Sequence, residues 1–179
     1  MSGHSHWAGI KHKKSITDAR RGKLFSKISR LISIAAKEKG GDPETNSQLR
    51  LAIEKAKEVN MPKDNIDKAI KRGTGQIAGS QIEEFIYEAY GPAGVAIIIT
   101  GITDNKNRTL AEIKHVLSKF KAKLAEAGSV KYLFDKQGKD WQPKYPLEAD
   151  PQAQKQLENL FEALDENEDV QEVYSNLRD

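Results

Sequence analysis

The spacing of apolar residues changes near the middle of the chain, and this change limits the folds that the sequence can adopt. Between residues 16 and 73, apolar side chains recur every three or four positions, which is typical of amphipathic helices. Residues 82–90 and 95–103 are instead rich in β-branched and aromatic residues, and Gly91 to Gly94 between them favour a turn. We therefore expect two units, a helical unit at residues 1–75 and an α+β unit at residues 76–179.

The first unit should contain three amphipathic helices. The first follows Ile16 and ends at Gly40, where two consecutive glycines stop the periodic pattern. The second helix should be capped by Asn46 or Ser47, and the third follows Pro62, whose missing N–H is tolerated at a helix start. Together these segments predict a three-helix domain.

The second unit should be a mainly antiparallel sheet with two helices on one face. Its expected elements are the hairpin of residues 82–103, a helix at 105–120, a strand at 129–134, an acidic helix around 157–164 and a strand at 170–174. Residues 136–150 have no periodicity and hold two prolines, so they are expected to form a connector. The order of the strands cannot be derived from the sequence.

The formal net charge of +3 conceals two regions of opposite sign. Residues 1–75 hold 17 basic and 8 acidic side chains, whereas residues 76–179 hold 12 basic and 18 acidic ones. A basic surface of this kind is typical of proteins that bind phosphate groups. The acidic unit could present a surface to a protein partner, although an acidic helix is more simply a solvated face.

The basic residues are densest in the first 30 positions. Arg20, Lys23, Lys27 and Arg30 should form one polar stripe on the first helix, opposite its apolar face. Lysines also cover most solvated helix faces without a partner, but here the density of cations favours contact with a nucleic-acid backbone. The candidate backbone contacts in this region are Lys11, Lys13, Lys14, Arg20, Arg21, Lys23, Lys27 and Arg30.

The N-terminal arm also holds three histidines and a tryptophan. His4, His6 and His12 lack the neighbouring carboxylates and fixed geometry that a metal site needs, so no metal is expected, and His4 and His12 are candidate nucleic-acid contacts. Trp7 could pack back on the first helix as an apolar anchor or stack on a base.

Two further segments have both a structural and a functional interpretation. Lys71 and Arg72 precede Gly73 as a basic last turn and glycine cap would, yet their charges could extend the basic surface. Asn105, Asn107 and Arg108 lie at a strand-to-helix turn, where they could cap the helix or form a secondary anion site.

Several classes of protein are disfavoured by what the sequence lacks. It has no cysteine, which removes disulfides and thiolate chemistry. Its longest apolar run is Val95 to Ile99, far too short to cross a membrane, so a cytoplasmic location is expected. No nucleophile-and-base set stands in a recognisable context, so we expect neither an enzyme nor a cofactor.

A series of short motifs resembles the YebC/PmpR family of gene-expression regulators, whose mitochondrial relatives are translational activators of cytochrome c oxidase. The matches occur in order along nearly the whole chain. They are Gly3–Trp7, Ile10–Lys14, Arg21–Lys27, Gly40–Pro43, Asn60–Ile66, Lys71–Gly73, Tyr90–Gly94, Thr103–Thr109, Gly128–Val130 and Asp169–Asn176.

The resemblance implies a basic helical domain followed by an α+β domain, which in the family is interrupted by a third, inserted domain. Here the chain passes through the connector of residues 136–150 almost directly to the acidic helix, so the inserted domain is expected to be missing. The resemblance also implies a DNA-binding transcriptional regulator or, alternatively, a ribosome-associated factor that binds rRNA or tRNA and relieves stalling at proline-rich stretches.

Overall fold

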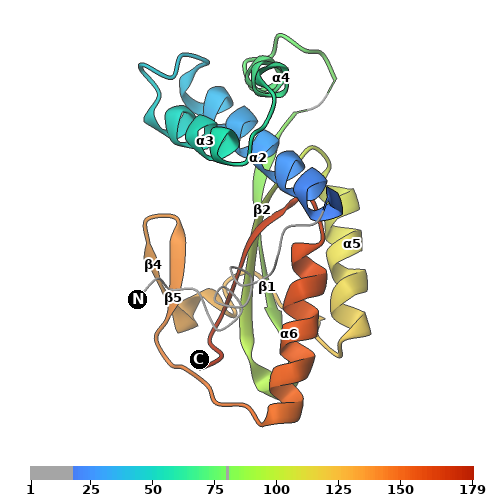
Figure 1. Ribbon diagram of the computed structural model, residues 1–179. Helices are drawn as coiled ribbons and strands as arrows, with labels where there is room; N and C mark the ends of the chain where they lie inside the picture. Colours follow the sequence, from blue (N-terminus) through green and yellow to red (C-terminus); the bar gives the residue numbers. More distant parts are fainter. Residues whose placement is uncertain (1–17, 80) are drawn as a thin grey trace. The chain divides into compact units, whose positions relative to one another are not determined.

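The structure, a computed structural model, describes residues 18–79 and 81–179. The elements are arranged along the chain as five helices, six strands and two short 3-10 helices within that part (Figure 1). They are α2 (Asp18–Lys39), α3 (Ser47–Glu58), α4 (Lys63–Gly73), β1 (Glu83–Tyr90), η1 (Pro92–Gly94), β2 (Ala96–Thr103), α5 (Lys106–Lys119), β3 (Lys123–Leu124), η2 (Lys131–Leu133), β4 (Phe134–Gln137), β5 (Asp140–Pro143), α6 (Pro151–Asp165) and β6 (Val170–Ser175).

Contacts divide the described chain into two compact units. The helical unit contains residues 18–85 together with 102–106, and the α+β unit contains residues 86–101 together with 107–179. The division therefore falls inside strands β1 and β2. The mixed fold class expected from the sequence, helices first and a mainly antiparallel sheet second, is confirmed.

Helices α2, α3 and α4 enclose one hydrophobic core in the helical unit. Ile32 and Leu49 are fully buried in it, and small side chains such as Ala56 and Ala69 let the helices approach closely. Asn46 joins two of these helices: its Oδ1 accepts a 3.1 Å hydrogen bond from the Leu49 N–H, while its Nδ2 donates to the carbonyl oxygens of Ala35 and Gly40. Of the two expected caps for α3, the structure has Asn46.

The sheet of the α+β unit has the strand order β3-β1-β2-β6. Strands β2 and β6 pair antiparallel, as do β1 and β3. Helices α5 and α6 lie together on one side of this sheet, as expected (Figure 1). On that side Gly91 lies so close to Ile97 and Leu157 that a Cβ at position 91 would be 3.0 Å and 3.1 Å from their side chains.

The other face of the sheet is covered by the β4–β5 hairpin. Phe134 and Trp141 of the hairpin pack with Ile98 and Tyr174 of the sheet in a second core. Two expectations for this region were wrong: residues 129–133 form turns and the short helix η2, and residues 136–143 belong largely to a hairpin. The alternation in this segment is too short to show in the sequence, because each strand has only four residues.

Candidate nucleic-acid interface

The described chain contains the second half of the expected basic surface. Six of the expected contact residues lie outside the described residues: His4, Trp7, Lys11, His12, Lys13 and Lys14.

None of the helices in residues 18–79 and 81–179 is both long and apolar enough to cross a membrane. In the same residues, no group of three or more His, Cys, Asp or Glu side chains could hold a metal ion.

The cations expected on one stripe of α2 differ in exposure. Arg21 is exposed, Arg20, Lys23 and Arg30 are half-buried, and Lys27 is buried with 8% of its surface exposed. Lys27 lies about 40° from Leu31 around the helix axis, at the margin of the apolar face. Lys27 is therefore less accessible than the other cations of the stripe, and its contact with a nucleic-acid backbone stays a prediction.

A groove of about 290 Å³ lies between α2 and α4 and collects cations from both helices. Arg30 of α2 and Lys68 and Arg72 of α4 supply its positive charge. Among the described residues, no Asp or Glu lines this groove. A concave surface lined by one sign of charge concentrates its field, so the groove is suited to an anion.

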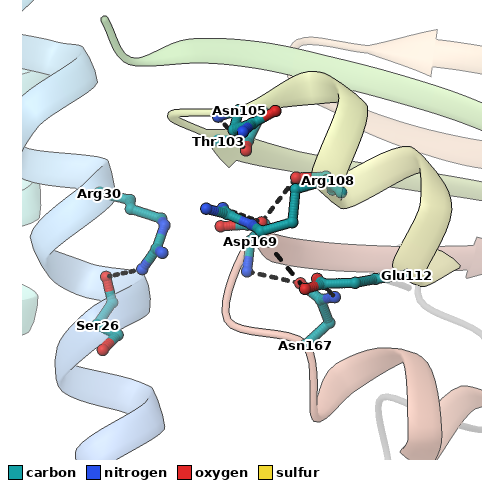
Figure 2. Close-up of polar contacts among 9 residues, drawn as sticks. Ser26, Arg30, Thr103, Asn105, Arg108, Glu112, Asn167 and Asp169 are labelled. Carbon is teal, nitrogen blue, oxygen red and sulfur yellow. Dashed lines mark hydrogen bonds and ion pairs between the residues drawn. The ribbon is translucent and has the colours of Figure 1, made fainter. Parts of the chain in front are cut away.

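The remaining lining of the groove is half polar and half apolar. Ser26, Ser29 and Asn65 supply hydroxyl and amide groups that can donate hydrogen bonds, whereas Phe25, Met61 and Ala69 are apolar. The Nη1 of Arg30 donates a 3.3 Å hydrogen bond to the Ser26 carbonyl oxygen, which directs the guanidinium along its own helix (Figure 2). This combination suits a phosphate attached to a less polar group.

The packing of α2 on α4 determines the geometry of the groove. A Cβ on Gly73 would lie 2.1 Å from the Ser33 carbonyl oxygen and 2.9 Å from the Ala36 Cβ, so only glycine fits between the helices at this point. One turn earlier, the Oγ of Ser33 donates a 2.7 Å hydrogen bond to the Ala69 carbonyl oxygen. These contacts hold Lys68 and Arg72 beside Arg30.

The two expected cations at the end of α4 have different positions. Arg72 lines the groove, whereas Lys71 is exposed and lies outside its lining. Both lie in the last helical turn, where positive charge favours the helix terminus. Lys68 was not predicted as a site residue, although Asn65, Lys68 and Arg72 follow one another at the spacing of a single helix face.

In the expected secondary anion site, Arg108 already forms an ion pair with a carboxylate of the protein. The Nη2 of Arg108 lies 2.9 Å from the Oδ2 of Asp169, which also accepts a 2.7 Å hydrogen bond from the Thr109 hydroxyl (Figure 2). The backbone N–H of Asn105 donates to the Thr103 hydroxyl at 2.9 Å, and α5 begins at the next residue. An anion at Arg108 would therefore compete with a buried carboxylate, and the site stays a prediction.

A buried carboxylate in the α+β unit escaped the sequence analysis. Both oxygens of Glu88 accept backbone hydrogen bonds, from Gly128 at 2.6 Å, Lys131 at 2.7 Å and Val130 at 3.0 Å. Burial raises the pKa of Glu88, but these three bonds outweigh it and hold the pKa below its usual value. Glu88 therefore anchors the 128–131 turn as a charged carboxylate.

Family comparisons match most of the chain. The TACO1/YebC protein N-terminal domain matches residues 5–76, and the TACO1/YebC second and third domain matches residues 82–140 and 139–177. The latter two ranges meet at residues 139 and 140. Gly138 and Lys139 form the turn of the β4–β5 hairpin there, and Gly138 has a φ of 61° that favours glycine. The junction lies within residues 136–150, where the inserted domain was expected to be missing, and its absence stays a prediction.

Two curated bacterial relatives match most of this chain and a smaller share of their own length. A probable transcriptional regulatory protein of Petrotoga mobilis is 51% identical over 174 residues, which are 97% of this chain and 69% of that protein. One of Halothermothrix orenii is 59% identical over 138 residues, which are 77% of this chain and 54% of that protein. The chain thus spans between about half and two thirds of the length of these relatives.

A solved structure has the same fold. The crystal structure of a conserved hypothetical protein from Aquifex aeolicus matches with a TM-score of 0.89 and 35% identity, and the match covers 97% of each chain. The family matches, the Petrotoga mobilis relative and this structural agreement each concern nearly the whole chain. The chain therefore belongs to the TACO1/YebC family.

Proposed function

We propose that the chain is a non-enzymatic, nucleic-acid-binding regulator of gene expression, and that it acts as a DNA-binding transcriptional regulator of the YebC/PmpR type. The observation that carries the proposal is the groove between α2 and α4, where Arg30, Lys68 and Arg72 come together. The names of the bacterial relatives support the regulatory part. The chain spans only part of those relatives, so its nucleic-acid target and its partners are proposed as well.

The groove would bind the nucleic-acid backbone mainly through charge. Each lysine or arginine that neutralises a phosphate releases condensed counterions, so affinity falls steeply as salt is added. Ser26, Ser29 and Asn65 would add hydrogen bonds to phosphate or sugar oxygens. These contacts position the protein on the backbone and carry no sequence information, so any preference for a site must arise elsewhere.

A ribosome-associated, RNA-binding factor is the second candidate, and the shape of the groove favours it. Direct reading of duplex DNA commonly uses a helix that protrudes into the major groove. Here the cations of the two helices line a concave site instead, and Lys27 on α2 is buried. A concave site of this size suits a segment of single-stranded or looped backbone, which RNA offers more often.

Lys68 and Lys71 provide a matched test of the groove, because both are exposed lysines on α4 and only Lys68 lines it. We expect Lys68→Ala to reduce the slope of log affinity against log salt by about 0.7–0.9, the effect of one lost phosphate contact. Lys71→Ala should change the slope less. Equal effects of the two substitutions, or no effect of Lys68→Ala, would show that the groove is not the binding surface.

The two candidate functions can be distinguished by what the protein binds, a duplex DNA site or the ribosome. A DNA regulator should enrich particular duplex sites from a random pool at physiological salt, whereas a translation factor should sediment with ribosomes. We would therefore combine a duplex selection with gradient sedimentation of cell lysate, with and without ribonuclease. Enrichment of one duplex motif without ribosome association supports the DNA regulator, and ribonuclease-sensitive sedimentation without a motif supports the alternative. A protein that does neither would contradict both.

A further inference from the structure

The α+β unit is not uniformly acidic. Residues 119–144 hold seven lysines and three acidic residues, whereas residues 145–179 hold two basic and ten acidic residues. The lysine-rich segment contains strands β3, β4 and β5 and the short helix η2. One part of this unit therefore has the charge that attracts phosphate.

Two of the large apolar side chains that are most exposed in the described chain belong to this neighbourhood. Tyr132 and Tyr145 are 62% and 65% exposed. The Lys144 N–H donates a 2.9 Å hydrogen bond to the Leu133 carbonyl oxygen, next to the Phe134–Pro143 pair of the hairpin. Tyr132 directly precedes Leu133 in the chain and Tyr145 directly follows Lys144, so both tyrosines lie at the same end of the hairpin.

Both tyrosines are attached to backbone that is held firmly. The three hydrogen bonds to Glu88 fix the turn that precedes Tyr132. The carbonyl oxygen of Tyr145 accepts a 3.3 Å hydrogen bond from the Asn176 side chain, and the Leu147 N–H donates to the Asn176 carbonyl oxygen at 2.6 Å. Binding of a ligand therefore does not have to order this backbone as well, and only the rotamer freedom of the rings is lost.

Three lysines are neighbours of the two tyrosines in the chain or in the sheet. Lys131 and Lys144 are their neighbours in the chain. Lys123 pairs with Tyr90 across β1 and β3, and Tyr90 in turn lies beside Tyr132 and donates a 3.0 Å hydrogen bond to the Ser129 carbonyl oxygen. Asp135 lies 3.5 Å from the Lys144 ammonium, in an exposed pair that contributes little to stability.

We propose that Tyr132 and Tyr145, with Lys123, Lys131 and Lys144, form a second binding surface that takes single-stranded nucleic acid. Bases would stack on the exposed rings while the lysines contact the flanking phosphates, which is a sequence-tolerant mode of binding. The proposal goes beyond the function assigned to the groove, because this surface belongs to the α+β unit and binds bases as well as backbone.

The test measures how the full chain binds a labelled single strand of about 12 nucleotides and the duplex of the same sequence. We expect Tyr132→Ala and Tyr145→Ala each to weaken binding of the single strand by about 5-fold or more, the loss expected for one stacked base. Tyr145→Phe keeps the ring and should bind nearly as the parent does, and Tyr132→Phe keeps the ring while it loses only the hydroxyl contact with Tyr90. Duplex binding should change little, because paired bases are already stacked.

Several outcomes would overturn the proposal. Unchanged single-strand affinity in both alanine variants would do so, as would equal losses in the phenylalanine variants or equal losses on the duplex. Both side chains are largely exposed, so all variants should fold, and a thermal melt checks this. The result is independent of the groove: a failed groove changes the outcome for Lys68→Ala and leaves the tyrosine comparison intact.

Discussion

The Oγ of Ser33 on α2 donates a 2.7 Å hydrogen bond to the carbonyl oxygen of Ala69 on α4. Both residues are buried, and Ala69 also forms part of the groove wall. Because this bond and the contact of Gly73 with the same serine hold the two helices together, the position of the groove cations depends on the helix packing beneath them.

Gly73→Ala should separate α4 from α2. The added Cβ would meet the Ser33 carbonyl oxygen at 2.1 Å, so the helices must shift, at an expected cost of about 1–3 kcal/mol in the free energy of unfolding. Gly22→Ala on α2 is the control, because nothing lies within 4 Å of its added Cβ. That change should instead stabilise the helix by about 0.5–1 kcal/mol. Urea unfolding measures both, and a fully stable Gly73→Ala variant would contradict the close packing.

Glu88→Gln should make the protein less sensitive to acid. The pKa of Glu88 lies below its usual value of 4.5, because three backbone hydrogen bonds outweigh the effect of burial, so the folded state favours the charged form. The resulting stabilisation is present above the pKa of the unfolded chain and is lost as the pH falls through the lower pKa of the folded protein.

We expect Glu88→Gln to lower the free energy of unfolding at pH 7 by about 1–3 kcal/mol, because the amide cannot accept all three bonds. Its stability should then decline less than that of the parent between pH 7 and pH 3. Glu84→Gln, an exposed position on the same strand, is the control and should follow the parent. Identical acid profiles for Glu88→Gln and the parent would show that Glu88 is not charged in the folded state.

Arg108→Ala and Arg178→Ala compare an ion pair whose carboxylate is buried with an ion pair that is exposed on both sides. The Arg108 partner, Asp169, has a side chain that is 3% exposed, whereas Arg178 pairs at 2.6 Å with Glu148, whose side chain is 74% exposed. Loss of Arg108 leaves a buried acceptor with fewer partners and should cost about 1–3 kcal/mol.

Loss of Arg178 should cost less than about 1 kcal/mol, because water solvates both charges of the exposed pair. Thermal unfolding at low and high salt measures the difference, since salt screens the exposed pair more strongly. Equal costs for the two arginine variants would mean that burial of Asp169 does not strengthen its pair with Arg108.

The helical elements could be predicted because their signals are local. The apolar periodicity of α2, the Asn46 cap of α3 and the position of Pro62 before α4 all act within a few residues. The β1–β2 hairpin was recognisable in the same way, from two β-rich runs around a glycine-containing turn.

The elements that the sequence analysis missed depend on distant partners. The two-residue strand β3 exists because it pairs with Ala89 and Tyr90. The turn at 128–131 is held by Glu88, some 40 positions earlier in the chain, so the β-rich composition of residues 129–134 was misleading. The β4–β5 hairpin is stabilised by Phe134 and Trp141 packing on the sheet.

The sequence by itself determined the period of each helix, the two-unit organisation of charge and the family to which the chain is similar. The tertiary structure determined which basic side chains lie close together. It buried Lys27 at the margin of an apolar face, brought Lys68 and Arg72 beside Arg30, and paired Arg108 with Asp169. Helix periodicity is a property of neighbouring residues, whereas a groove depends on how closely two helices approach, which here is set by Ser33 and Gly73.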